Sequence, residues 1–105
     1  MPDHYLVITS WPDFDGATEQ AGHWLEKKLA ASVNILPPMR SMYHWKGEIR
    51  RGSEHKIFIK TTGDRLDALQ QEIRAAHPYA VAEILHFRID SADPDYLDWI
   101  NRSTQ

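Results

Sequence analysis

The sequence predicts an α+β domain in which an antiparallel sheet packs against helices. Two stretches with helical periodicity are separated by β-rich runs, and the two middle β-rich runs follow one another with no helix between them. The length of 105 residues, of which 42% are hydrophobic, suits one domain over residues 1–105 and leaves little room for a second.

The first two elements are a strand and a helix. The run Tyr5–Thr9 is β-branched and aromatic, and a turn signal at Trp11–Asp13 ends it. Beyond Asp15 the hydrophobic residues recur at helical spacing, at Ala21, Trp24, Leu25 and Leu29. This spacing predicts a helix over residues 16–31, capped by Asp15 or Thr18.

The middle of the chain is extended in character from Ser32 to Arg50. Pro37-Pro38 forbids a continuous helix there and breaks any central strand ladder. Arg51-Gly52-Ser53 is a turn signal, and the alternating residues Glu54–Thr61 predict the returning strand. We therefore expect a hairpin with a long first arm and a short second arm.

The last third of the chain predicts a helix, a strand and a terminal helix. The second helix begins at Gly63-Asp64 and ends where His77 meets Pro78. Ala82–Ile89 is the fourth strand, and a short helix carries Tyr96–Ile100. The order strand, helix, strand, strand, helix, strand predicts the ferredoxin-like β-α-β-β-α-β sandwich with a short C-terminal helix.

The length of the extended arm predicts self-association. A domain of this size has a radius of gyration near ~13 Å. The arm Val33–Arg50 would span roughly 60 Å when fully extended. Half of it therefore lacks a local strand, and an unpaired edge that carries Met42, Tyr43 and Trp45 needs a second subunit to cover it. The alternative is that Pro37-Pro38 splits the arm into two short strands within a monomer.

Composition excludes several classes of protein. The formal net charge is −3 and the basic residues form no stripe, which argues against nucleic-acid binding. No apolar stretch is long enough for a membrane span, and the start Pro2-Asp3-His4 does not resemble a signal peptide, so we expect a cytoplasmic protein. With no cysteine there is no disulfide, thiolate nucleophile or cysteine-rich zinc site.

Five motifs in succession resemble the CutA family of divalent-cation tolerance proteins. They are Leu29–Pro37, Ser41–Ile49, Lys60-Thr61, His77-Pro78-Tyr79 followed by Glu83-Ile84, and Tyr96–Ile100. Their order and spacing agree with the family over nearly the whole chain. The resemblance implies a ferredoxin-like protomer in a tight homotrimer with strand pairing between subunits, similar to the PII signalling proteins.

The resemblance also implies a divalent metal site. The family's suspected ligands are a cysteine after Ala-Ala, the histidine of His-Pro-Tyr and a later glutamate, which correspond here to Ser32, His77 and Glu83. Ser32 replaces the thiolate, so the expected ligands are the imidazole and the carboxylate, with weak affinity for Cu(II) or another divalent metal. His77 also ends a helix, where an imidazole can bind free carbonyls instead.

Aromatic and basic residues suggest a ligand pocket or an interface. If the hairpin turns at residues 51–54, Lys60 lies opposite Trp45, where the amine and the indole would pack as a pocket wall. Tyr43 and Trp45 are expected in the trimer interface. Ser32, Trp45, Lys60 and Tyr79 are the residues expected to line a small-molecule or anion pocket between subunits.

Three functions remain open at this stage. The first is a non-enzymatic, trimeric protein that responds to divalent metal, copper above all, or binds a small ligand. The second is a trimeric scaffold or PII-like anchoring protein without metal. The third, a small enzyme, is disfavoured because the sequence offers no glycine-rich phosphate loop and no Ser/His/Asp arrangement.

Overall fold

The computed structural model describes residues 3–105, so Met1 and Pro2 lie outside the description. The expected order of elements is confirmed, with the second strand divided into two. The elements are β1 (His4–Trp11), α1 (Phe14–Glu26), β2 (Ser32–Ile35), β3 (Met39–Trp45), β4 (Glu48–Thr62), α2 (Gly63–Ala76), β5 (Ile84–Arg88) and α3 (Pro94–Ser103).

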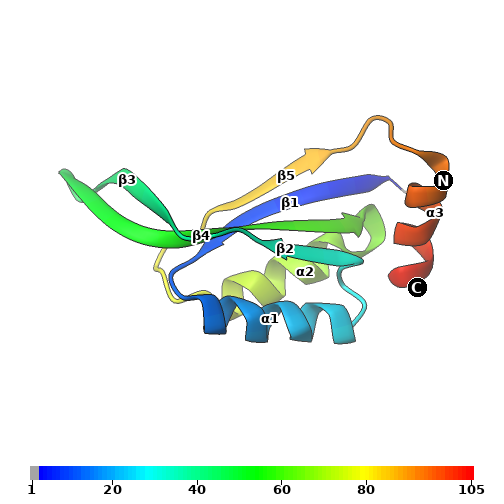
Figure 1. The fold of residues 1–105 in the computed structure, drawn as a ribbon, viewed down its shortest axis with the longest axis horizontal. Helices are drawn as coiled ribbons and strands as arrows, with labels where there is room; N and C mark the ends of the chain where they lie inside the picture. Colours follow the sequence, from blue (N-terminus) through cyan, green and yellow to red (C-terminus); the bar gives the residue numbers. More distant parts are fainter. Residues whose placement is uncertain (1–2) are drawn as a thin grey trace.

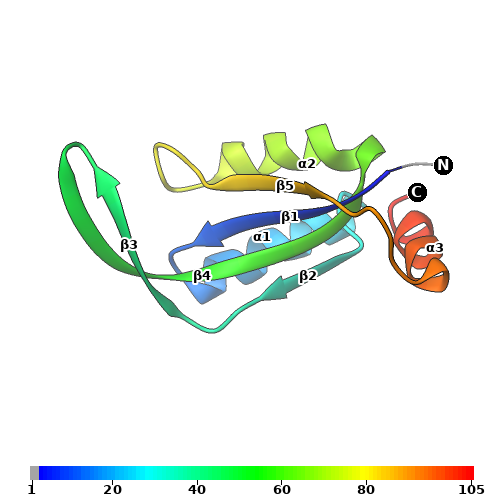
Figure 2. The ribbon, with the colours of Figure 1, turned by 90° about the horizontal axis from the view of Figure 1, so that it is seen from above.

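The sheet has the ferredoxin-like strand order. Its strands lie in the order β2-β4-β1-β5 with every pair antiparallel, and β3 pairs with the first half of β4. Helices α1 and α2 cover one face of the sheet, while α3 packs at the end where β1 begins (Figures 1 and 2). The opposite face of the sheet carries no helix within residues 3–105, and Leu85 and Phe87 remain exposed on it.

The hydrophobic core lies between the sheet and the two helices. Val7 of β1 and Ile57 and Ile59 of β4 point to the same side and are fully buried, as their cross-strand register requires. Trp24 of α1 is also fully buried and meets Trp11 edge-to-face, with ring centroids 6.1 Å apart. Each such side chain stabilises the fold by about 1.5–3 kcal/mol through apolar burial.

Helix α1 begins and ends earlier than residues 16–31. Its N-cap is Asp13, not Asp15 or Thr18, because the Asp13 carboxylate accepts a hydrogen bond from the Gly16 N–H at 2.7 Å. At the other end Lys28 adopts a left-handed conformation with φ of 58°. The Leu29 N–H then bonds the Trp24 carbonyl and the Lys28 N–H bonds the Leu25 carbonyl, a Schellman stop.

The hairpin turn predicted at Arg51-Gly52-Ser53 is wrong. The chain turns at Lys46-Gly47, where both residues have positive φ of 50° and 78°, the backbone that a two-residue hairpin turn needs. Trp45 therefore pairs with Glu48, and residues 51–53 lie within β4. The strong turn composition of Arg51-Gly52-Ser53 is overridden by cross-strand pairing on both sides of it.

The returning strand is the long one, so both parts of the extended arm find a partner within the chain. Of the fifteen residues of β4, Glu48–Glu54 pair with β3 and Ile57–Lys60 pair with β2, and the proline pair at 37–38 separates those two strands. The expectation that half of the arm lacks a local partner is wrong. The β3–β4 hairpin nevertheless projects beyond the helical layer, and the molecule measures 45 × 26 × 23 Å (Figure 1).

No helix within residues 3–105 combines the length and the apolar character that a membrane crossing requires.

Candidate functional site

Polar side chains from three segments meet where β1 ends. Ser10 of β1 and Lys56 of β4 are cross-strand partners, so both point to the face of the sheet that has no helix. The loop that follows α2 brings His77 and Glu83 to the same place. We call these four residues the Ser10 cluster.

Ser10 joins the two residues that the resemblance pairs as metal ligands. Its hydroxyl donates a hydrogen bond to Glu83 Oε1 at 2.8 Å, while its carbonyl oxygen lies 2.7 Å from His77 Nε2. Ser10 is only 3% exposed, and Lys56 Nζ lies 3.3 Å from its hydroxyl and 2.7 Å from Glu83 Oε1. The structure thus brings His77 and Glu83 together through a serine that the sequence did not single out.

Both ring nitrogens of His77 are engaged within the chain. Nδ1 accepts a hydrogen bond from the Tyr79 backbone N–H at 3.1 Å, so Nε2 carries the proton that it donates to the Ser10 carbonyl. The ring also lies between Trp11 and Tyr79, with centroid distances of 4.5 and 4.9 Å. A metal ion would have to displace one of these two hydrogen bonds to reach the imidazole.

The electrostatics of the Glu83 carboxyl favour its charged form. Burial alone would raise its pKa, but hydrogen bonds from Lys56 and Ser10 and the charge of Lys56 outweigh burial and hold the pKa below its ordinary value. Glu83 is thus a carboxylate at neutral pH, with Oε1 already occupied by two donors.

A second acidic residue adjoins the cluster through Tyr79. The Tyr79 hydroxyl donates to Glu54 Oε2 at 3.2 Å. Burial, followed by the negative charge of Glu54, raises the Tyr79 pKa to about 12. Tyr79 therefore stays a neutral hydrogen-bond donor throughout the physiological range.

The four residues expected to line one pocket lie on four different segments of the protomer, with Ser32 in β2, Trp45 in β3, Lys60 in β4 and Tyr79 in the loop after α2. Ser32 and Lys60 are cross-strand partners, but Lys60 Nζ donates to Asn34 Oδ1 at 2.8 Å. The predicted contact between Lys60 and Trp45 is wrong because the turn lies elsewhere, and the Trp45 ring instead has the Lys46 ammonium 5.8 Å from its centroid. Tyr79 contacts Glu54, between these two ends.

Ser32 keeps a buried hydroxyl with no hydrogen-bond partner within the described chain. The site equivalent to the family's cysteine therefore lies opposite Lys60 on the neighbouring strand and is not a member of the Ser10 cluster. The expected interface residue Tyr43 is 47% exposed on the projecting hairpin, where its neighbour Met42 is 58% exposed.

Residues 3–105 contain no preformed metal site, because no group of three or more His, Asp or Glu side chains converges there. Two ligands, His77 and Glu83, are the most that the Ser10 cluster offers, and a tight divalent site in proteins takes more. Sequence reasoning missed Ser10 and Lys56 because neither belongs to a motif. Their proximity follows from the β1–β4 register, which pairs strands far apart in the chain and is encoded by no local pattern.

Comparison with known proteins decides the family. A sequence model of the CutA1 divalent ion tolerance protein family matches residues 5–103. The chain belongs to this family. It is 36% identical over 101 residues to the divalent-cation tolerance protein CutA of Pectobacterium atrosepticum, with 96% of this chain and 92% of that protein covered.

Longer CutA proteins and solved structures agree with the assignment. The mouse protein CutA is 39% identical over 99 residues, which cover 94% of this chain, although the chain spans only 56% of that relative's length. The crystal structure of CutA1 from Ehrlichia chaffeensis has a TM-score of 0.94 at 31% identity and covers 100% of this chain and 98% of its own. The relatives from Pectobacterium atrosepticum and Ehrlichia chaffeensis are both named for divalent-ion tolerance.

Proposed function

We propose that this CutA-family chain is a non-enzymatic homotrimeric protein of divalent-cation tolerance whose working site lies between subunits. The observation that carries the trimer is the uncovered face of the sheet. On that face Ile8 pairs with Leu85, and Leu6 pairs with Phe87, and these two β5 side chains remain 45% and 48% exposed. An apolar sheet face of this kind favours association.

The projecting hairpin supports the same proposal. Strand β3 pairs only with β4, so its other edge offers unpaired backbone groups to a second chain. A hairpin that reaches from one protomer onto the next makes a head-to-tail contact, and three such contacts close a ring. Tyr43 and Trp45 are the side chains that we assign to this contact.

Light scattering tests the assembly. We expect a mass of about three times 12.2 kDa, reduced in Trp45→Asp and in Phe87→Asp. Leu25→Asp is the matched control, since Leu25 is 42% exposed but lies on α1, away from both surfaces. A monomer at micromolar concentration, or equal dissociation by all three variants, would contradict the proposal.

The non-enzymatic part of the proposal rests on how Ser10 and Lys56 are occupied. A serine and a lysine 3.3 Å apart form a possible nucleophile and base. Here the Lys56 ammonium is paired with Glu83 at 2.7 Å, and the Ser10 hydroxyl donates to the same carboxylate oxygen. The lysine is thus not a free base for the serine. Turnover that disappears in Lys56→Met would overturn this part.

We further propose that the divalent metal, Cu(II) in particular, binds weakly through His77 and Glu83. The imidazole and the carboxylate suit Cu(II) or Zn(II), and their junction at Ser10 holds them side by side. Calorimetry should detect weak Cu(II) binding that is lost in His77→Ala. His23→Ala, which removes a half-exposed imidazole on α1, is the control. Equal affinity in the native protein and His77→Ala would refute the site.

One observation favours a second candidate, a trimeric scaffold or PII-like anchoring protein without metal. Both His77 nitrogens already have partners in the chain, which gives the residue a structural role at the end of α2. A calorimetric trace without heat for Cu(II) and Zn(II), together with an intact trimer, would support the scaffold over the metal-binding protein.

A further inference from the structure

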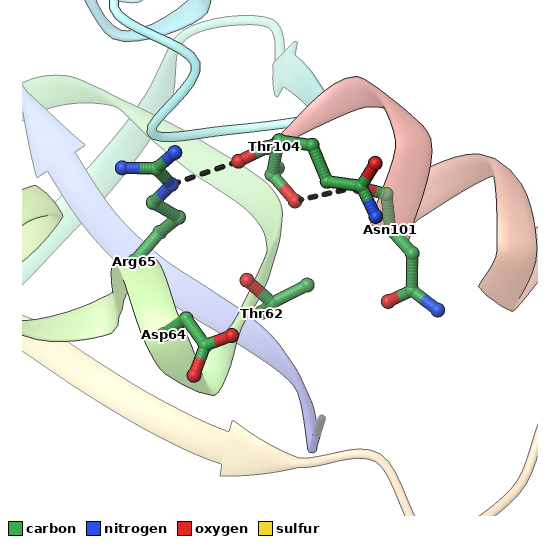
Figure 3. Close-up of a pocket in the computed structure, with 6 residues that line it drawn as sticks. Thr62, Asp64, Arg65, Asn101 and Thr104 are labelled. Atoms are coloured by element: carbon green, nitrogen blue, oxygen red, sulfur yellow. Dashed lines mark hydrogen bonds between the residues drawn. The ribbon is translucent and has the colours of Figure 1, made fainter. Parts of the chain in front are cut away.

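A small polar pocket lies at the end of the sheet opposite the Ser10 cluster. It opens where β4 passes into α2 and where α3 ends, and its volume is about 190 Å³. Its lining consists almost entirely of hydrogen-bonding and charged side chains, namely Thr62, Asp64, Arg65, Asn101, Thr104 and Gln105 (Figure 3). Pockets for drug-sized ligands are larger, so the size restricts an occupant to a few heavy atoms.

Thr62 places an unused hydroxyl in this pocket. The residue is the N-cap of α2 and only 4% exposed, yet its side chain makes no capping hydrogen bond. The caps of α1 and α3, Asp13 and Asp93, each accept a backbone N–H. The Thr62 hydroxyl points instead toward the space between Arg65 and Thr104 (Figure 3). The hydroxyl is therefore available to hydrogen-bond a ligand in the pocket.

The start of α2 adds backbone donors to the same space. The first N–H groups of a helix have no intrahelical acceptor, and the Thr62 side chain bonds none of them. The Gly63 N–H is used, since it donates to the Asp3 carbonyl at 2.8 Å. The next two N–H groups remain available, and they carry the positive end of the helix dipole.

Arg65 is held in place with most of its donors free. Its Nε donates to the Thr104 carbonyl at 2.8 Å, which fixes the guanidinium over the pocket. Within residues 3–105 neither Arg65 nor Asp64 has an ion-pair partner at 4.0 Å or less. In the view of Figure 3 the Asp64 carboxylate lies well apart from the guanidinium, at the other end of the labelled residues. The pocket thus has a cationic end and an anionic end.

We propose that this pocket binds a small zwitterion, an aminocarboxylate with one carboxylate and one ammonium group. The ligand carboxylate meets the free Arg65 donors, the Thr62 hydroxyl and the first N–H groups of α2. The ligand ammonium meets Asp64. Inorganic phosphate is a poor fit because the Asp64 carboxylate would face its negative charge at close range.

The experiment titrates the protein with glycine, β-alanine and 4-aminobutyrate, and shifts of the amide NMR signals report binding. Acetate and methylammonium serve as the two halves of the ligand, and inorganic phosphate as the plain anion. We expect saturable shifts at residues 62–66 and 101–105 with at least one aminocarboxylate, at an affinity at least about tenfold above either half. The three ligands differ in the distance between their carboxylate and ammonium groups. The ligand that binds most tightly therefore indicates the distance between the cationic and anionic ends of the pocket.

Variants assign the contacts. Arg65→Gln and Asp64→Asn should each weaken binding about tenfold or more, and Thr62→Val should weaken it while Thr62→Ser retains it. Arg74→Gln and Asp67→Asn are matched controls, because both residues lie on α2 outside the pocket. Thr62→Ser and Asp64→Asn keep the site testable if Thr62→Val does not fold. No saturation by any aminocarboxylate, equal binding of acetate or phosphate, or an unchanged affinity in Arg65→Gln would overturn the proposal.

Discussion

Lys56 Nζ lies 2.7 Å from Glu83 Oε1, and this ion pair fastens the loop between α2 and β5 to the central strand β4. Ser10 donates to the same carboxylate oxygen, so the attachment is shared by two strands. The Glu83 carboxylate thus helps to hold the loop that carries His77 and Tyr79, and its titration has consequences that can be measured.

The pKa of Glu83 should depend on the ion pair with Lys56. Because the folded-state pKa is lowered, the contribution of Glu83 to stability is complete above its unfolded value of about 4.3 and is lost as pH falls through the folded value. Lys56→Met removes the hydrogen bond that contributes most to lowering the Glu83 pKa, so NMR titration of the carboxyl group should show a higher Glu83 pKa in this variant. Lys60→Met, which removes a lysine bonded to Asn34, should leave it unchanged.

Tyr79 should titrate later than an ordinary tyrosine. Its pKa is raised to about 12, so its stabilising effect is complete below about pH 10 and is lost as pH rises from there through about 12. The tyrosinate absorbance of the native protein, compared with that of Tyr79→Phe, isolates this group. Glu54→Gln should move the titration toward lower pH, and an unaltered curve would exclude the contact between the two side chains.

The two-residue turn at Lys46-Gly47 should favour glycine over any other residue at position 47. Gly47→Ala forces a side chain into a left-handed backbone with φ of 78°, and we expect a loss of about 1 kcal/mol in the free energy of unfolding. Gly22→Ala is the opposite case, because Gly22 lies inside α1 with open space around it. It should raise the free energy by about 0.5–1 kcal/mol in urea denaturation. The same sign for both variants would place the turn elsewhere.

Replacing Ser32 with alanine should stabilise the fold. Its buried hydroxyl lacks a partner, so Ser32→Ala should raise the free energy of unfolding by about 1 kcal/mol. Thr61→Val is the contrast, since the Thr61 hydroxyl is buried but donates to the Leu29 carbonyl at 2.7 Å. That variant should lower the free energy by about 1 kcal/mol or more. Thermal unfolding at neutral pH compares the two, and destabilisation by Ser32→Ala would mean that the hydroxyl is satisfied in solution.

Local patterns were sufficient for the order of the elements. Helical spacing in the two helices and β-branched runs in the strands act over a few residues, so they can be read without knowing what packs against them. The end of α2 at His77 and the start of α3 are confirmed for this reason. Motif order was likewise sufficient for the CutA family.

The hairpin was harder because two turn signals competed. Lys46-Gly47 and Arg51-Gly52-Ser53 both contain glycine, and nothing local distinguishes them. Pairing of β4 with β3 in its first half and with β2 in its second half decided between them. The misplaced turn then shifted the register, which wrongly set Lys60 opposite Trp45.

The amino-acid sequence by itself determined the fold class, the family and the presence of an extended segment too long for the globule, because these depend on residue types and local spacing. Only the tertiary structure decided that Ser10 joins His77 to Glu83 and that Arg65 of α2 bonds the Thr104 carbonyl at the end of α3. These groups are distant in the chain or bonded through backbone atoms. Their proximity is set by strand register and helix docking, which no local pattern encodes.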